Sequence, residues 1–414
     1  MAALVLPEIG RLVETGDPWE PYRLLGPEGE RIEATAVYFA DLQARGQPTT
    51  TIRSYALELL RWWRFLWALD VQWDRATRME ARDFARWMQI ADKPVRVHWR
   101  LKQRGITTPS LPSATRAEPG TPNPITGKPS PGTKYAPTTR AHAETVLRGF
   151  YDFHLDEGTG PIINPFPLDR SHRGRRSHAH HDPREPFRGE RRGRYRPKVP
   201  DRIPRLVPDE MFDQLFAGLK YHRDRALLAF WVSTGARADE LLTTRQADPL
   251  PGEQLIGVVR KGSRDYQQLP VSVDAFVWLR LYQEEAWRRG LPRGRREPLW
   301  WTLRRPWRPL EYHAARAMFV RANELLGSNW TLHDLRHTAS YRMAQDPHMS
   351  LVNVQWVLGH RSLSTTQRYL NPSQEEVVRS VLAHFERRQQ KPTPPPPAPG
   401  YNPESLSILF GGRS

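Results

Sequence analysis

The sequence predicts a mainly α-helical protein with a small antiparallel β-sheet, organised as two domains. The chain has 414 residues, and chains of this length usually form more than one domain. On either side of a Pro- and Arg-rich middle segment, apolar residues recur at steps of three and four, which is the helical period. Two short strand-like runs, 255–260 and 266–273, flank a turn and predict a hairpin.

The composition narrows the classes of function. The net charge is +17, and only eight of the 62 basic residues are lysine, which leaves 54 arginines. Arginine grips phosphate with a planar fork that lysine lacks. A high-GC genome also enriches arginine, but it does not explain the net charge, which favours nucleic acid or an anionic membrane surface as the partner. Without cysteine, the chain has no disulfide, zinc finger or thiol nucleophile.

We expect a cytoplasmic protein associated with the nucleoid. The first residues lack the basic and apolar regions of a secretory signal. No run approaches 18 apolar residues, so the sequence predicts no membrane-spanning helix.

The first domain is expected at residues 33–168, after a Pro- and Gly-containing lead over residues 1–32. One helix is predicted from Thr49 onwards, with the threonines there as candidate N-caps, and another over Met79–Ile90, opened by Thr77. The tryptophans of these helices could stack on bases, but such a stripe more often forms a core. They are Trp62, Trp63, Trp67 and Trp87.

An irregular insertion is expected at residues 103–138, where eight prolines accompany many Gly, Ser and Thr residues. A further helix is predicted over Thr139–Asp156, and Asn164-Pro165 marks the end of the first domain. A basic linker follows at residues 169–204. Its residues 170–198 hold ten arginines and one lysine against three acidic residues, and this excess of positive charge is nearly half of the net charge of the chain.

Four histidines of this linker could bind a metal, but no carboxylate or thiol stands at ligand spacing beside them. They are His172, His178, His180 and His181. A flexible strap along a DNA backbone fits the charge better, because counterion release rewards such a segment.

The second domain is expected at residues 205–390, and a Pro-rich tail follows over residues 391–414. Around the predicted hairpin, the pattern predicts helices over 209–220, 223–234, 275–289, 312–326, 330–346, 352–358 and 374–388.

Five basic residues and one tyrosine follow a fixed order in the second domain: Arg237, Lys261, His333, Arg336, His360 and Tyr369. A cluster of cations with a phenol suits attack of a tyrosine on a phosphodiester, because fixed donors stabilise the negative charge that builds on the phosphate. The pattern His-x-x-Arg alone occurs six times in the chain and means little. The specific signal is the order of four short motifs, here called boxes, that surround these residues. They are Ser233–Leu242, Arg260-Lys261-Gly262, Leu332–His337 and Leu358-Gly359-His360, and the tyrosine follows nine residues after the last.

In these four separated boxes the chain resembles the tyrosine recombinase (phage integrase) family over most of residues 205–390. Residues 33–168 resemble the helical, SAM-like core-binding domain of that family. The insertion and the basic linker resemble those of integrases from actinobacterial mobile elements. The resemblance implies two domains that clamp double-stranded DNA, a tetrameric synapse of the protein with itself, a possible directionality factor, and cleavage without a metal or cofactor.

The resemblance also implies a role for each residue. Tyr369 would be the nucleophile that forms a 3′-phosphotyrosine and frees a 5′-hydroxyl. Arg237 and Arg336 would hold the non-bridging phosphate oxygens, and Lys261 would protonate the leaving 5′-oxygen. His333 would assist removal of the tyrosine proton.

Three more residues support this set in the resemblance. His360 would hydrogen-bond the phosphate, and Glu240 and His337 would support the groups that contact it. The apolar last helix, Gln374–Arg388, would dock on a neighbouring protomer, with packing on its own domain as the alternative.

Several of these residues have simpler interpretations. Arg237 could be only a structural partner of the glutamate one turn later, and Arg260 or Arg264 could contact phosphate in place of the lysine between them. His333 and Arg336 could be surface residues, and His360 could be a helix C-cap.

The function also has alternatives. Tyr341 and Tyr401 compete with Tyr369 for the role of nucleophile. The chain could resolve chromosome dimers by the same chemistry, or it could be a DNA-binding regulator that does not cleave.

Overall fold

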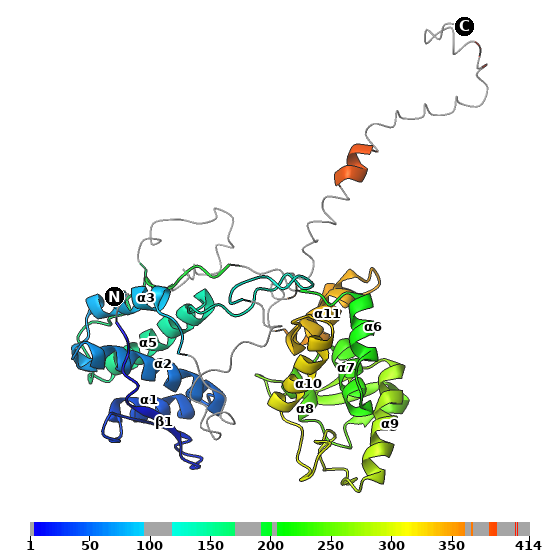
Figure 1. The fold of residues 1–414 in the computed structure, drawn as a ribbon, viewed down its shortest axis with the longest axis horizontal. Coiled ribbons are helices and arrows are strands. Elements are labelled where there is room, and N and C mark those ends of the chain that lie inside the picture. Colours follow the sequence, from blue (N-terminus) through cyan, green and yellow to red (C-terminus); the bar gives the residue numbers. More distant parts are fainter. Residues whose placement is uncertain are drawn as a thin grey trace. The chain divides into compact units, whose positions relative to one another are not determined.

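The computed structural model describes residues 4–94, 118–169, 192–200 and 205–360, together with residues 366, 381–386, 402 and 404. The chain divides into two compact units, Met1–Arg202 and Ile203–Ser414. Both units are built mainly of helices, and each holds one small antiparallel sheet (Figure 1). The predicted fold class is therefore confirmed.

The first unit is a helical bundle with a hairpin against it. Its elements are β1 (Arg11–Glu14), β2 (Tyr22–Leu25), α1 (Glu33–Ala44), α2 (Thr49–Ala68), η1 (Trp73–Arg75), α3 (Arg78–Ile90) and α5 (Pro137–Asp156). The helix predicted over Met79–Ile90 is confirmed, and Thr77 caps its N-terminus through a capping box with Glu80. The N-cap of α2 is Pro48, without a side-chain cap, so the prediction that a threonine caps it was wrong.

Tryptophans form the centre of this unit, as the core interpretation predicted. Trp62 is fully buried, and Trp63 and Trp87 are almost so. The indole of Trp62 donates to the Tyr151 hydroxyl over 2.9 Å, and that hydroxyl donates to the Trp73 carbonyl over 2.8 Å. Because these polar atoms are paired, the aromatic core buries its large area without an unsatisfied donor at its centre.

The lead over residues 1–32, for which the sequence predicted no element, contains the hairpin of β1 and β2. Arg64 on α2 fixes the approach to this hairpin, because its guanidinium donates to the carbonyls of Ile9 and Gly10. Gly10 has a φ of 67°, and an added Cβ would lie 2.7 Å from the Trp67 ring, so only glycine fits there.

The second unit is built around one buried helix, α7 (His222–Thr234). Its elements are α6 (Asp209–Ala217), α7 (His222–Thr234), α8 (Ala238–Leu242), β3 (Pro249–Leu250), η2 (Pro251–Glu253), β4 (Leu255–Val259), β5 (Tyr266–Pro270), α9 (Val273–Arg288), α10 (Tyr312–Leu325), α11 (Leu332–Gln345) and α12 (Leu351–Leu358). α7 lies between α9 and α11 (Figure 1), and its Leu227, Phe230 and Trp231 are buried. The elements predicted between residues 209 and 358 are confirmed to within a few residues, and the short β3 extends the hairpin to a three-stranded sheet. Of the helix predicted over 374–388, only residues 381–386 lie within the described residues, and they are helical.

Part of the predicted irregular insertion can be described. Residues 118–136 form turns with two isolated bridges, one between Asp92 and Lys134 and one between Pro122 and Pro129. Residues 170–191 and 201–204 of the basic linker, among them its four histidines, lie outside the described residues. In the described ranges, no helix is both long and apolar enough to cross a bilayer.

Candidate active site

The site begins where α7 ends. Gly235 terminates this helix with a φ of 62°, and an added Cβ would lie 2.9 Å from the Leu358 side chain. The chain then turns so that Arg237 stands at the start of α8. Glu240, one turn later, accepts from the Arg237 backbone N–H and from its guanidinium, both over 2.9 Å. The left-handed glycine thus sets the direction in which Arg237 leaves the core.

Glu240 is a buried carboxylate shared by several donors. Its side chain is 1% exposed. Besides Arg237, it accepts from the Arg260 guanidinium over 3.1 Å and from the Lys261 backbone N–H over 3.0 Å. Burial alone would raise the pKa of Glu240, but these hydrogen bonds and the charge of Arg260 lower it below its ordinary value. Glu240 is therefore ionised, and it holds both Arg237 and the hairpin turn that carries Lys261.

Arg260 ties the hairpin to α12. It is 4% exposed, and its guanidinium donates to Gln267 over 2.7 Å and to the Val357 carbonyl. Gly359, with a φ of 63°, leaves room for this guanidinium, since an added Cβ would lie 3.1 Å from its Nε. Through these contacts Arg260 holds the hairpin turn against α12, so the geometry gives it a structural role.

Lys261 lies on the exposed side of the same turn. Its ammonium pairs with Asp239 over 2.9 Å, and the two side chains are 61% and 46% exposed. Exposed pairs of this kind contribute little, in general up to about 1 kcal/mol, so the lysine can exchange this partner for another anion. Arg264 is also exposed, at a φ of 62°.

Arg336 stands at the junction of three segments. It lies on α11 and is 3% exposed. Its guanidinium donates to the Gly235 carbonyl over 2.6 Å and to the Leu358 carbonyl over 2.7 Å, and it lies 3.0 Å from the His360 ring nitrogen Nε2. The surface-residue alternative for Arg336 is therefore wrong, because the side chain joins the ends of α7 and α12.

His360 is held as a neutral ring. Burial, together with the charges of Arg336, Arg237 and Arg260, lowers the pKa of His360 to about 4. Since Arg336 can only donate, Nε2 accepts from it and Nδ1 carries the proton toward Thr366 Oγ1, 2.9 Å away. The C-cap of α12 is Gly359, so the alternative that His360 serves as the cap was wrong.

His333 and His337 lie one turn apart on α11. Thr331 and Asp334 start this helix with a capping box. The two imidazole rings meet edge to face with centroids 4.3 Å apart. His333 is exposed, three residues before Arg336, and the two therefore share one side of the helix.

Three tyrosines are candidates for the nucleophile. Tyr369 and Tyr401 lie outside the described residues. Tyr341 lies on α11, five residues after Arg336, which places it about 140° around the helix from the guanidinium. This direction makes Tyr341 a poor candidate for attack on a phosphate bound by Arg336.

The structure thus groups most of the residues singled out in the sequence. Arg237, Lys261 and Glu240 form one network, and Arg336 and His360 form another that meets it at Gly235. Sequence reasoning assigned no partner role to the residues that position these groups, which are Asp239, Arg260, Gln355, Val357 and Thr366. In the sequence, the signal for such partners was a polar residue beside each box.

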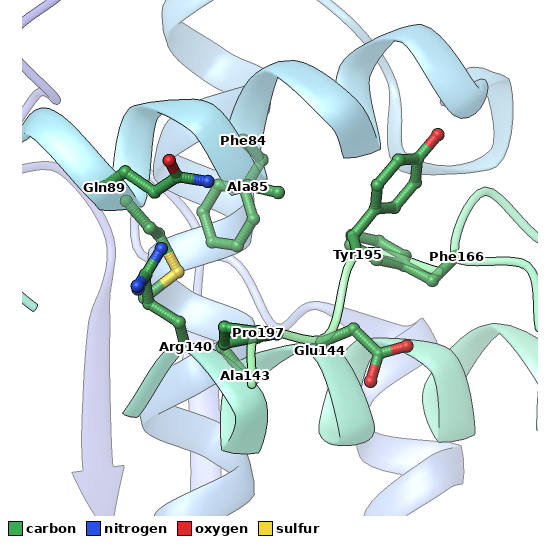
Figure 2. A pocket seen from close by; sticks show the side chains of 10 residues that line it. Phe84, Ala85, Gln89, Arg140, Ala143, Glu144, Phe166, Tyr195 and Pro197 are labelled. Carbon is green, nitrogen blue, oxygen red and sulfur yellow. The ribbon is translucent and has the colours of Figure 1, made fainter. Parts of the chain in front are cut away.

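A small pocket in the first unit is a separate feature. It lies between α3 and α5 beside Tyr195 and Pro197 (Figure 2). Glu144 lines it and is 4% exposed, and neither of its oxygens has a hydrogen-bond partner within the described ranges. Across the residues that the structure describes, no group of three or more His, Asp or Glu side chains could hold a metal ion.

Parts of the chain are similar to known proteins. Residues 205–376 match the model of the phage integrase family. The chain is 29% identical over 185 residues to tyrosine recombinase XerC of Chlamydia pneumoniae, and this alignment covers 43% of this chain and 57% of the relative. It is 27% identical over 268 residues to tyrosine recombinase XerD of Xanthomonas campestris pv. campestris, and this alignment covers 61% of this chain and 74% of the relative. The first match therefore spans little more than half of that relative's length.

A solved structure shares the fold. The XerH site-specific recombinase, bound to a palindromic difH substrate in a post-cleavage complex, has a TM-score of 0.52 at 16% identity. The alignment covers 85% of each chain.

Proposed function

We propose that the chain is a site-specific recombinase of the phage integrase family that cleaves and rejoins duplex DNA, because residues 205–376 match the model of that family. The observation that carries the proposal is the meeting of Arg237, Arg336 and His360 around Gly235. The Arg237 side chain, 33% exposed, offers its guanidinium to the phosphate of a DNA strand, and the buried guanidinium of Arg336 adds positive charge beside it.

In the proposed reaction, the Tyr369 oxygen attacks phosphorus and the bond from phosphorus to the 5′-oxygen breaks. This leaves a 3′-phosphotyrosine and a free 5′-hydroxyl, so the energy of the ester is conserved. His333 receives the phenol proton, and Lys261 gives a proton to the leaving oxygen. Attack of a 5′-hydroxyl from a partner strand on the phosphotyrosine reverses these steps and rejoins the DNA.

The described contacts support the assigned roles through preorganisation. Arg336 is fixed by two backbone carbonyls, and Arg237 by a buried carboxylate, so neither guanidinium needs to be ordered when a phosphate binds. His360, neutral at pH 7 with its proton on Nδ1, does not add a further positive charge beside the arginines. Lys261, on an exposed turn, has the freedom to approach a leaving group.

We further propose how the parts divide this work. Residues 33–168 would be the core-binding domain and residues 205–390 the catalytic domain, and together they would clamp double-stranded DNA. Residues 381–386 are helical, and three apolar side chains on them are 43–56% exposed, which suits docking on a second copy in a tetrameric synapse. They are Val381, Leu382 and Phe385.

The experiment that tests the reaction uses nicked duplexes taken from the DNA that flanks the gene. Cleavage releases a short strand that diffuses away, so the covalent intermediate accumulates and migrates as a protein–DNA adduct on a denaturing gel. We expect an adduct from the wild type and from Tyr341→Phe, and none from Tyr369→Phe. An adduct that persists in Tyr369→Phe, or a wild type without any adduct, contradicts the proposal.

The biological setting is a finer proposal. We propose that the protein acts in the nucleoid on the ends of a mobile element, with a directionality factor to select excision, because the long insertion and the tail suit a dedicated integrase better than a housekeeping resolvase of chromosome dimers. An adjacent tRNA gene with a direct repeat would support integration. A target confined to one chromosomal site in cells that lack any element would instead indicate dimer resolution.

A further inference from the structure

The segment after α9 presents a cluster of arginines that the proposed reaction does not use. Six arginines between residues 293 and 308 are exposed, and in the part of the chain that the structure describes none has a carboxylate within ion-pair distance. They are Arg293, Arg295, Arg296, Arg304, Arg305 and Arg308, here called the arginine surface. The only acidic residue between them in the sequence is Glu297.

Arginines on the neighbouring helix behave differently. On α9, Arg280 and Arg288 pair with Glu284, and Arg289 pairs with Glu285. On α9, two glutamates thus partly offset the charge of three arginines, whereas within the described residues no ion pair offsets the charge of the arginine surface. The arginine surface therefore carries the larger uncompensated positive charge for an external anion.

The arginine surface is built on a fixed loop. Trp300 is fully buried and its indole donates to the Leu241 carbonyl over 2.8 Å, while the Trp301 indole donates to the Pro298 carbonyl over 2.7 Å. The guanidinium of Arg305 lies over the Trp307 ring, 4.6 Å from its centroid, and that of Arg293 lies over Trp287 at 5.0 Å. Stacking restricts these side chains while leaving their N–H groups at the surface.

The position of this loop follows from α7. The Gly235 carbonyl, at the end of the helix, contacts Arg336 in the candidate active site. Arg223, twelve residues earlier at the start of the helix, donates to the Trp301 carbonyl over 3.0 Å. At 1.5 Å per residue the two ends are about 18 Å apart. This length corresponds to about five base pairs of duplex.

We propose that the arginine surface binds the backbone phosphates of duplex DNA away from the scissile phosphate, without reading the base sequence. The inference rests on the proposed function, because it assumes that the same duplex lies at the candidate active site. Arginine forks match phosphate oxygens, and each phosphate contact releases condensed counterions, so binding would depend steeply on salt.

The test measures binding of the full chain to a random-sequence duplex over a range of salt concentrations. All proteins carry Tyr369→Phe, so the measurement reads binding alone and stays informative if the proposed cleavage fails. The first variant adds Arg295→Gln, Arg304→Gln and Arg308→Gln. A matched control instead adds Arg280→Gln, Arg288→Gln and Arg289→Gln, which removes the same charge from paired positions.

Each lost phosphate contact lowers the slope of log affinity against log salt by about 0.9, so the first variant should lose about 2 to 3 in slope. The control should lose less than about 1. Equal losses in both variants would show a bulk effect of net charge and overturn the proposal. An unchanged slope in the first variant would also overturn it, and would leave an acidic protein as the partner to test.

Discussion

Two buried carboxylates show opposite ways of placing a charge inside this protein. Glu240 in the second unit accepts hydrogen bonds from Arg237, Arg260 and the Lys261 backbone, and its pKa lies below the ordinary value. Glu144 in the first unit has no hydrogen-bond partner within the described ranges. Burial raises its pKa, although Arg148 lies 3.7 Å away. Equal depth of burial therefore has opposite consequences, and the number of donors decides which one results.

The largest expected effect follows from removal of the satisfied carboxylate. Glu240→Ala leaves the buried guanidinium of Arg260 without its counter-ion and frees the Arg237 side chain. We expect a loss of about 3–5 kcal/mol of stability, measured by urea unfolding of the full chain, together with loss of the DNA adduct. Asp239→Ala, at the exposed neighbouring position, is the control and should change stability by less than about 1 kcal/mol. A small effect of Glu240→Ala would show that the network contributes little.

A smaller effect is expected from Arg260→Met, which keeps the volume but removes the donors to Glu240, Gln267 and Val357. The carboxylate retains its other partners, so we expect a loss of about 2 kcal/mol in the same unfolding experiment. Cleavage should slow as well, because the hairpin turn that carries Lys261 is no longer tied to α12. Arg264→Met, on the same turn, should leave stability unchanged, and an equal loss from it would argue against a specific role of the buried arginine.

The pH dependence of stability tests the environment of His360. Its pKa in the folded protein is about 4, below the ordinary value of 6.5. Between these two pH values the unfolded chain binds a proton at this residue and the folded chain does not. This group therefore stabilises the fold fully above about pH 6.5, and the contribution is lost as the pH falls toward 4. His360→Asn should lose less stability than the wild type over that window. Parallel curves for the two proteins would mean that the ring is not held neutral.

The smallest effect, and one of opposite sign, is expected at Glu144. Glu144→Gln removes a charge that is buried without hydrogen bonds, so we expect stability at pH 8 to rise by about 1 kcal/mol. The raised pKa predicts that this gain shrinks as the pH falls and the wild-type carboxyl becomes protonated. Glu157→Gln, an exposed substitution at the end of the same helix, serves as the control. A loss of stability in Glu144→Gln would show that the charge of Arg148 already compensates the burial.

The sequence predicted the elements whose signals are local. The Thr77 cap of α3, the end of α7 at Gly235 and the turn that carries Lys261 all depend on residues within one turn of each other. α1 was missed although Thr35, Tyr38, Phe39 and Leu42 follow the helical spacing, since small and polar residues are interspersed with its apolar ones.

The partners inside the site were not predictable in the same way. Arg260 was one of three basic residues on a turn, and only the packing of α12 against that turn separates it from Lys261 as the buried member. Likewise, the missing partners of Glu144 depend on how the segment around Gly193 covers α5, where an added Cβ would lie 1.5 Å from the carboxylate. Contacts between residues far apart in the chain decide both outcomes.

The most direct test of the proposed chemistry is to identify the residue that carries the DNA in the covalent adduct. Protease digestion of the adduct followed by mass spectrometry would locate the nucleotide on one peptide. We expect it on Tyr369, joined through a 3′-phosphate, with a free 5′-hydroxyl on the released strand. A nucleotide on Tyr341, on Tyr401 or on a residue of another type would contradict the proposed reaction.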